Sequence, residues 1–147
     1  MEDRCAYEEV LVADDDIDDF EVLRLAIHEV GADIRVSRAE NGDILLGLIG
    51  EKVPDLLFLD IHMPCRDGKS CIREIRNNHK FDNLPVIVYS GNQDTNLINF
   101  FYRYRANHYV CKPASYDELA DVVRKIFSTK KETMLEATAQ HEFVLNS

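Results

Sequence analysis

The sequence contains no long hydrophobic run. No stretch is long or apolar enough to cross a bilayer, and the first nine residues, MEDRCAYEE, have neither an apolar signal core nor a cleavage-like site. We therefore expect a cytoplasmic protein with no membrane partner. The four cysteines, Cys5, Cys65, Cys71 and Cys111, form no C-x-x-C pair, so we expect reduced thiols in buried or half-buried positions.

Positive charge is scarce as well. The chain has 17 Lys and Arg against 27 Asp and Glu, a formal net charge of -10. This balance disfavours direct binding of nucleic acid or of an anionic membrane, and it suits a divalent cation. With 147 residues, 46% of them hydrophobic, the chain is long enough for one domain around a single core.

Short apolar segments alternate with segments of helical periodicity along the chain. Strands are predicted for residues 8–13, 33–39, 54–60, 84–90 and 107–112. Helices are predicted for residues 17–30, 43–51, 67–77, 95–105 and 115–127. This alternation is typical of an α/β fold with a doubly wound, five-stranded parallel sheet between two helical layers.

The domain organisation follows from the same pattern. Residues 1–7 are predicted to be an N-terminal extension, residues 8–128 the folded domain and residues 129–147 a C-terminal tail. The tail is polar with a few scattered apolar residues. A loose segment and an extra helix both remain open for it.

Polar residues stand at the ends of four predicted strands. They are Asp14, Asp15 and Asp16 after the first strand, Asp60 after the third, Ser90 after the fourth and Lys112 after the fifth. In open α/β sheets the working site lies beyond the carboxyl ends of the strands. Adjacent carboxylates repel, so a cluster of them there favours a cation.

The chemistry of these residue types suits phosphate and a metal. Asp14 and Asp15 offer hard oxygen ligands for Mg²⁺, while Asp60 can act as a ligand or as a nucleophile that forms an aspartyl-phosphate. Lys112 and Ser90 can bind phosphate oxygens. The three aspartates, Asp14 to Asp16, could instead be the acidic start of a helix. An EF-hand calcium loop that starts at Asp14 is excluded, because Asp19 stands at its glycine position and Leu25 at its glutamate position.

Four segments, taken together, resemble a known family. LVADDD, PDLLFLDIHMPCRDG, LPVIVYSG and ANHYVCKP are similar, in order and spacing, to receiver domains of two-component response regulators of the chemotaxis-regulator type. The resemblance covers about residues 8–127. It implies the flavodoxin-like strand order 2-1-3-4-5, which places the third strand beside the first.

The resemblance also implies a role for each site residue. Asp60 matches the phosphoacceptor, and Asp14 and Asp15 match the acidic pair that binds Mg²⁺ (or Mn²⁺), Asp15 directly and Asp14 largely through water. His62 stands where the family uses a backbone carbonyl as a metal ligand. The positions of His62 and Asn92 tune the lifetime of the phosphorylated form.

Further residues match the family's switch. Ser90 corresponds to the hydroxyl that turns toward the phosphoryl group, Tyr109 to the aromatic that then swings inward, and Lys112 to the phosphate-pairing lysine. Pro113 matches the proline that follows it, whose peptide bond is cis in the family. Two departures, Arg105 at a common glycine position and Ala114 at a frequent phenylalanine position, lie near the surface that signals.

The implied function is that of a stand-alone response regulator. A sensor histidine kinase or a histidine phosphotransfer protein would donate the phosphoryl group, and an unknown downstream protein would bind the altered surface formed by residues 95–127. A homodimer through that surface is left open. The protein would be no enzyme beyond catalysing its own phosphorylation and dephosphorylation.

Two other functions compete. One is a receiver-like interaction module that works without phosphorylation, against which the complete set of acidic, hydroxyl and lysine residues counts. The other is a phosphatase of the haloacid dehalogenase kind. That class resembles D-x-D-x-T, whereas here His62 stands at the position of the second aspartate.

Overall fold

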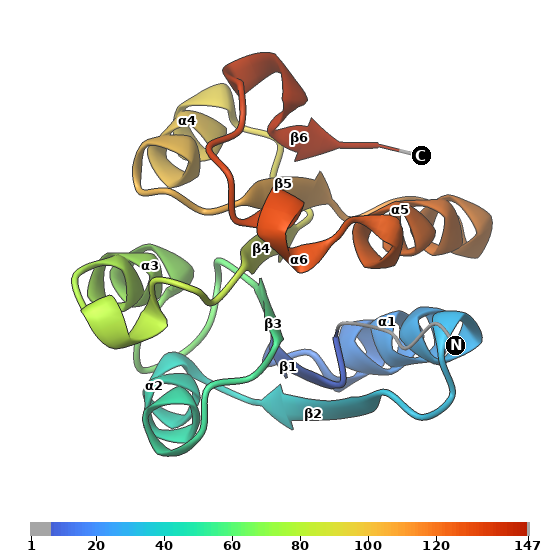
Figure 1. The fold of residues 1–147 in the computed structure, drawn as a ribbon, viewed down its shortest axis with the longest axis horizontal. Helices are drawn as coiled ribbons and strands as arrows, with labels where there is room; N and C mark the ends of the chain where they lie inside the picture. The colour runs from blue at the N-terminus through green and yellow to red at the C-terminus, as the bar shows by residue number, and fades with distance from the viewer. Residues whose placement is uncertain (1–6, 147) are drawn as a thin grey trace.

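A parallel sheet forms the centre of the computed structural model, which describes residues 7–146 (Figure 1). Within these residues the sheet has the order β2-β1-β3-β4-β5-β6, and each neighbouring pair is parallel. The strands are β1 (Glu9–Ala13), β2 (Arg35–Ala39), β3 (Leu56–Leu59), β4 (Val86–Ser90), β5 (His108–Cys111) and β6 (Val144–Leu145). The doubly wound fold and the order of the first five strands are confirmed, and β6 is an addition that was not predicted.

Helices cover both faces of the sheet. They are α1 (Ile17–Val30), α2 (Gly42–Glu51), α3 (Gly68–Arg76), α4 (Thr95–Arg103), α5 (Tyr116–Ser128) and α6 (Lys131–Met134), with 3-10 turns η1 (His79–Phe81) and η2 (Gln140–Glu142). Figure 1 shows α1 and α5 on one side of the sheet and α2, α3 and α4 on the other. The layers are therefore those expected from right-handed crossovers between parallel strands.

Polar caps decide where the main helices begin. The side chains of Asp16, Asn41, Asp67, Asp94 and Ser115 each accept a hydrogen bond from a backbone N–H in the first turn of the helix that follows. These bonds satisfy donors that have no partner within the helix. The loops that hold the site are thus anchored at the start of α1, α3 and α4.

The core lies on both sides of the central strands. All four residues of β3, LLFL, and all five of β4, VIVYS, are buried. One apolar cluster lies under α2, α3 and α4, and a second lies under α1 and α5. A strand covered on both faces needs a continuous apolar run, which explains why these segments lack polar alternation.

The C-terminal tail packs onto the domain. After α5 it forms the four-residue helix α6, a loop, η2 and the short strand β6 beside β5. Met134 and Phe143 are each only 1% exposed. Burial of these apolar side chains is what draws the tail back to the sheet.

The cysteines agree only partly with expectation. Cys71 is buried and Cys111 half-buried, but Cys65 is exposed in the loop after β3, and all three are free thiols. The prediction of burial is therefore wrong for Cys65, because the loop that carries it lies on the surface; Cys5 lies outside the described residues. Within residues 7–146, no helix has the length and apolar character needed to cross a membrane.

Candidate functional site

Three carboxylates meet at the carboxyl ends of β1 and β3. The two strands pair with Ala13 opposite Leu59, so Asp14 and Asp60 follow at neighbouring places. The exposed fraction is 0% for Asp14 and 7% for Asp60, whereas Asp15 is exposed. One oxygen from each of the three carboxylates lies within 4.8 Å of the others. This separation allows one cation to contact all three.

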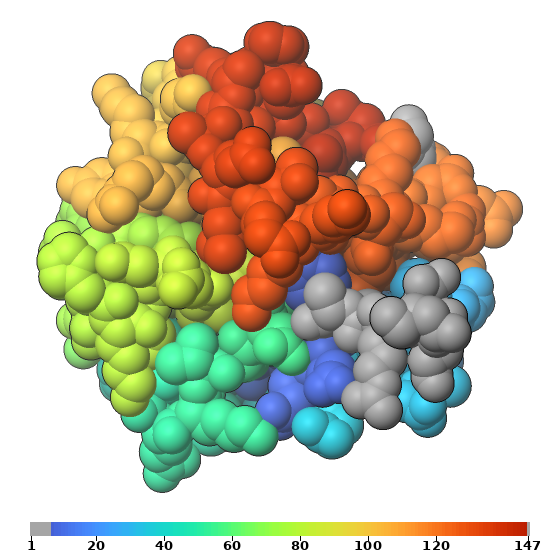
Figure 2. Space-filling model, in the orientation of Figure 1, coloured from blue at the N-terminus to red at the C-terminus, as the bar shows by residue number. Residues whose placement is uncertain are grey.

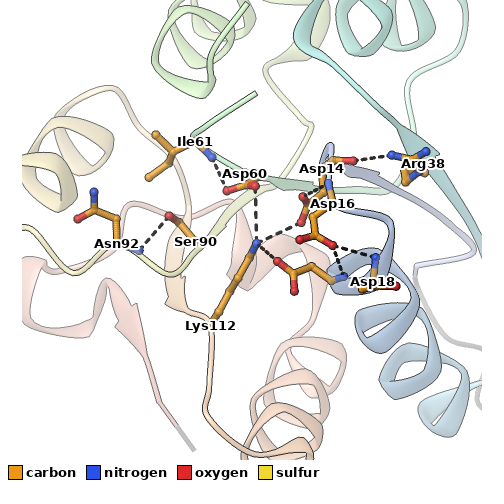
Figure 3. Close-up of polar contacts among 10 residues, drawn as sticks. Asp14, Asp16, Asp18, Arg38, Asp60, Ile61, Ser90, Asn92 and Lys112 are labelled. Carbon is orange, nitrogen blue, oxygen red and sulfur yellow. Dashed lines mark hydrogen bonds and ion pairs between the residues drawn. The ribbon is translucent and has the colours of Figure 1, made fainter. Parts of the chain in front are cut away.

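Lys112 supplies the positive charge from the end of β5. Its Nζ lies 3.2 Å from Asp14 Oδ2 and 3.6 Å from Asp60 Oδ2 (Figure 3). It also lies 2.7 Å from Asp19 Oδ2, in the first turn of α1. The ammonium group therefore lies beside the two buried carboxylates, Asp14 and Asp60, and Asp19 is a further partner that the sequence did not reveal.

Burial and mutual repulsion change the ionisation of this cluster. Burial raises the pKa of Asp14 to about 6, and the negative charge of Asp60 adds to this, although the Asp16 N–H and Lys112 act in the opposite direction. For Lys112, burial acts to lower the pKa, but Asp19, Asp60 and Asp14 outweigh it, so the pKa is raised and the amine stays charged. Buried anions that repel one another fit a divalent cation, which would relieve that repulsion.

Asp16 has a structural task instead. Its carboxylate accepts hydrogen bonds from the backbone N–H groups of Asp18 at 2.9 Å and Asp19 at 3.1 Å. Its own N–H donates to Asp14 Oδ1 at 2.9 Å, which orients that carboxylate (Figure 3). The interpretation of an acidic helix start therefore holds for Asp16, while Asp14 and Asp15 face the site.

The carboxylate of Asp60 is oriented by the backbone. Its Oδ1 accepts a hydrogen bond from the Ile61 N–H at 2.8 Å, while Oδ2 is the atom nearest Lys112 (Figure 3). Gly68, at the start of α3, donates its N–H to the Ile61 carbonyl at 2.8 Å. A Cβ at position 68 would lie 2.6 Å from the Asp60 carbonyl oxygen, so only glycine fits there. The sequence signal for this contact was the Asp-Gly pair in CRDG.

The predicted switch residues form a short chain of hydrogen bonds. Ser90 is buried at the end of β4, and its Oγ accepts from the Asn92 N–H at 3.1 Å (Figure 3). The hydroxyl of Tyr109 donates to the Asn92 carbonyl at 2.6 Å. Tyr109 is fully buried, and burial raises the pKa of its hydroxyl to about 12. The aromatic ring thus occupies the inward position, in contact with the loop that follows Ser90.

The remaining predicted residues lie around this centre. His62 is exposed in the loop after β3, and Pro113 is half-buried after Lys112. No cis peptide bond occurs among residues 7–146, so the expected cis bond before Pro113 is wrong. The bond has the trans form, which is the lower in energy for a prolyl peptide in the absence of tertiary constraint.

Comparison with known sequences shows which family the chain belongs to. The sequence model described as the Response regulator receiver domain matches residues 10–124. The chain belongs to this family. Receiver domains accept a phosphoryl group within two-component signalling and bind a divalent metal at their acidic pocket.

Individual relatives agree with this receiver assignment. The DNA-binding transcriptional regulator NtrC of Salmonella typhimurium is 33% identical over 123 residues, which cover 84% of this chain and 25% of that protein. The probable C4-dicarboxylate response regulator DctR of Bacillus subtilis is 31% identical, over 90% of this chain and 58% of that protein. The chain therefore spans about a quarter to just over half the length of these relatives.

Solved receiver structures share the fold. A putative response regulator from Chloroflexus aurantiacus superposes with a TM-score of 0.72 at 28% identity, covering 84% of this chain and 99% of that one. The receiver domain of the Francisella response regulator 1452 gives a TM-score of 0.69 at 30% identity, over 82% and 97%. The receiver's sheet and helices thus account for most of the chain.

Proposed function

We propose that this receiver domain accepts a phosphoryl group on Asp60 from the phosphohistidine of a sensor histidine kinase or a histidine phosphotransfer protein. The observation that carries the proposal is the convergence of Asp14, Asp15 and Asp60 within 4.8 Å, with the Lys112 ammonium beside them. Phosphoryl transfer depends mainly on positioning and charge neutralisation, and this arrangement supplies both.

The transfer exchanges one bond for another. A carboxylate oxygen of Asp60 attacks phosphorus, the P–N bond to the donor histidine breaks, and the electron pair stays on the imidazole nitrogen. Lys112, held charged by its acidic neighbours, neutralises oxygens of the phosphoryl group. Asp14, Asp15, Asp60 and the backbone carbonyl of His62 would hold Mg²⁺ or Mn²⁺, which supplies the remaining charge neutralisation when bound.

Two events follow phosphorylation: hydrolysis of the aspartyl-phosphate and a change in the surface that binds a downstream protein. Water attacks phosphorus, and the Asp60 carboxylate leaves, so the protein catalyses only its own phosphorylation and dephosphorylation. The positions of His62 and Asn92 beside the site suit a role in the rate of this step. Ser90 and Tyr109 repack around the phosphoryl group, and the surface of α4, β5 and α5 changes its affinity for a downstream protein.

Intact-mass measurement after incubation with acetyl phosphate and Mg²⁺ tests the proposal. We expect a gain of one phosphate per chain, lost in Asp60→Asn and retained in Asp18→Asn, whose carboxylate is exposed on the first turn of α1. Absence of any gain in the folded protein would favour the alternative, a receiver-like interaction module that works without phosphorylation.

A further inference from the structure

The tail lies on the face formed by α4, β5 and α5. Strand β6 pairs in parallel with β5, with Tyr109 opposite Val144 and Val110 opposite Leu145. Gln140 Nε2 donates to Asn99 Oδ1 of α4 at 3.1 Å, and Lys125 Nζ of α5 donates to the Asn146 carbonyl. In Figures 1 and 2 the red end of the chain lies between the yellow-orange α4 and the orange α5. One short segment thus contacts all three elements.

Phe143 anchors this segment through its side chain and its backbone. Phe143 is 1% exposed. The centroid of its ring lies 5.2 Å from the ring centroid of Tyr102 and 6.3 Å from that of Tyr109. Its carbonyl accepts from the Tyr109 N–H at 3.0 Å and faces His108 Nδ1 at 3.1 Å. Because a carbonyl can only accept, His108 carries its proton on Nδ1, and the face recognises an aromatic ring and a peptide oxygen together.

The tail lies outside the part of the chain that matches the receiver family, and it covers an edge of the sheet that would otherwise be open. The receiver match ends at residue 124, and the sheet order β2-β1-β3-β4-β5 is complete before the tail begins. Without β6, the outer side of β5 would present unpaired backbone groups beside an apolar hollow. An extended segment that adds to such an edge gains affinity from backbone hydrogen bonds and specificity from one inserted side chain.

We propose that the face of α4, β5 and α5 binds an extended segment of a partner protein, parallel to β5 and with an aromatic side chain in the place of Phe143. Residues 140–145 are the copy of that segment that the chain carries itself, and they compete with the partner. The inference rests on the proposed function, because it assigns a partner to the surface that phosphorylation is expected to alter.

A physical link joins this face to the phosphorylation site. Tyr109 contacts Phe143 on one side and donates to the Asn92 carbonyl on the other, and the Asn92 N–H donates to Ser90 Oγ. A group in the place of Phe143 therefore stabilises the inward ring of Tyr109 and, through it, the loop after Ser90. Coupling between two sites is reciprocal. The factor by which a bound segment favours one arrangement of Ser90 is therefore also the factor by which that arrangement raises the affinity of the face for the segment.

Binding of a labelled peptide in trans tests the competition. The probe is the chain's own sequence AQHEFVLN, residues 139–146, added to the 147-residue chain carrying Phe143→Ala and to the wild type without metal or phosphate. We expect at least a tenfold higher affinity for Phe143→Ala, measured by fluorescence anisotropy, and loss of binding when the peptide's Phe is replaced by Ala. Equal affinity for both proteins, or indifference to the peptide's Phe, would overturn the proposal.

A measurement on the wild type covers the case in which Phe143→Ala does not fold. We expect the amide of Tyr109, bonded to Phe143, to exchange with solvent hydrogen at least tenfold faster than the amide of Asp60, which is bonded to Ala13 in the sheet centre. Equal rates would mean that the tail opens only on global unfolding, and a wild-type dimer with exchanged tails would make a second copy the occupant; either result overturns the proposal. Both tests can also be carried out on the Asp60→Asn variant, which cannot be phosphorylated at that position. A negative result in them is therefore distinguishable from a failure of the proposed phosphoryl transfer.

Discussion

Lys112 Nζ lies 2.7 Å from Asp19 Oδ2, closer than to either buried carboxylate of the site. Asp19 belongs to the first turn of α1 and is partly exposed, so it holds the ammonium group at the mouth of the pocket. If Asp60 accepts a phosphoryl group as proposed, the oxygens of that group would share Lys112 with Asp19. On the proposed function, we expect Asp19 to compete with the phosphoryl group for this cation.

Asp19→Asn should speed phosphorylation. An ion pair that is partly exposed contributes about 0.2–1 kcal/mol, so we expect the rate with acetyl phosphate and Mg²⁺ to rise by a factor of about 1.4 to 5. The measurement is the time course of phosphorylated protein by intact mass. Asp18→Asn, one residue earlier on the same turn, is the matched control and should leave the rate unchanged; a slower Asp19→Asn would show that Asp19 assists Lys112.

Asp14→Asn should stabilise the metal-free protein at neutral pH. In the folded state the pKa of Asp14 is raised from 3.8 to about 6, so its contribution to stability is present below about pH 4 and is lost as pH rises through 6. Removal of the charge should recover on the order of 3 kcal/mol at pH 7.5.

Urea denaturation at pH 5 and pH 7.5 without metal measures this effect. The fall in stability between the two pH values should be smaller in Asp14→Asn, while Asp33→Asn, an exposed control, should behave as the wild type. A variant less stable than the wild type at pH 7.5 would contradict the assigned repulsion.

Arg76→Ala should destabilise the fold. The buried Arg76 guanidinium donates to the carbonyls of Phe81, Leu84 and Arg105 and to Asn107 Oδ1. Its loss leaves several buried acceptors without donors, and we expect a decrease of about 3 kcal/mol in the free energy of unfolding by urea. Arg103→Ala, an exposed arginine on α4, should change it by less than about 0.5 kcal/mol.

Gly68→Ala should impair both stability and phosphorylation. The new Cβ would lie 2.6 Å from the Asp60 carbonyl oxygen and 2.8 Å from Ile61 Cα, so the backbone that orients the Asp60 carboxylate must move. We expect a loss of about 1–3 kcal/mol in unfolding free energy and slower phosphorylation. Gly47→Ala in α2 meets nothing within 4 Å and should stabilise the helix by up to about 1 kcal/mol, without effect on the rate.

Much of the fold could be predicted from local patterns. Strands β3 and β4 are continuous apolar runs, and α1 and α5 carry apolar residues at helical spacing, so the period of the sequence indicates their type. The residue types at the strand ends predicted Asp14, Asp15, Asp60 and Lys112 as one site, because parallel strands bring their carboxyl ends to the same edge.

Other features depend on packing between distant segments. Strand β6 has two residues, Val144 and Leu145, which are too few for a periodic signal, and it forms because β5 offers an open edge. The contact of Asp19 with Lys112 joins residues 93 positions apart and follows from the place of α1 above the strand ends.

The order of residues by itself determined the α/β fold and the identity of the acidic, hydroxyl and lysine groups, since periodicity and charge are local properties of a chain. Only the tertiary structure decided that Asp19 shares Lys112, that Gly68 lies against Asp60, and that Phe143 covers Tyr109. These contacts depend on distances between elements, and such distances are set by how the whole core packs.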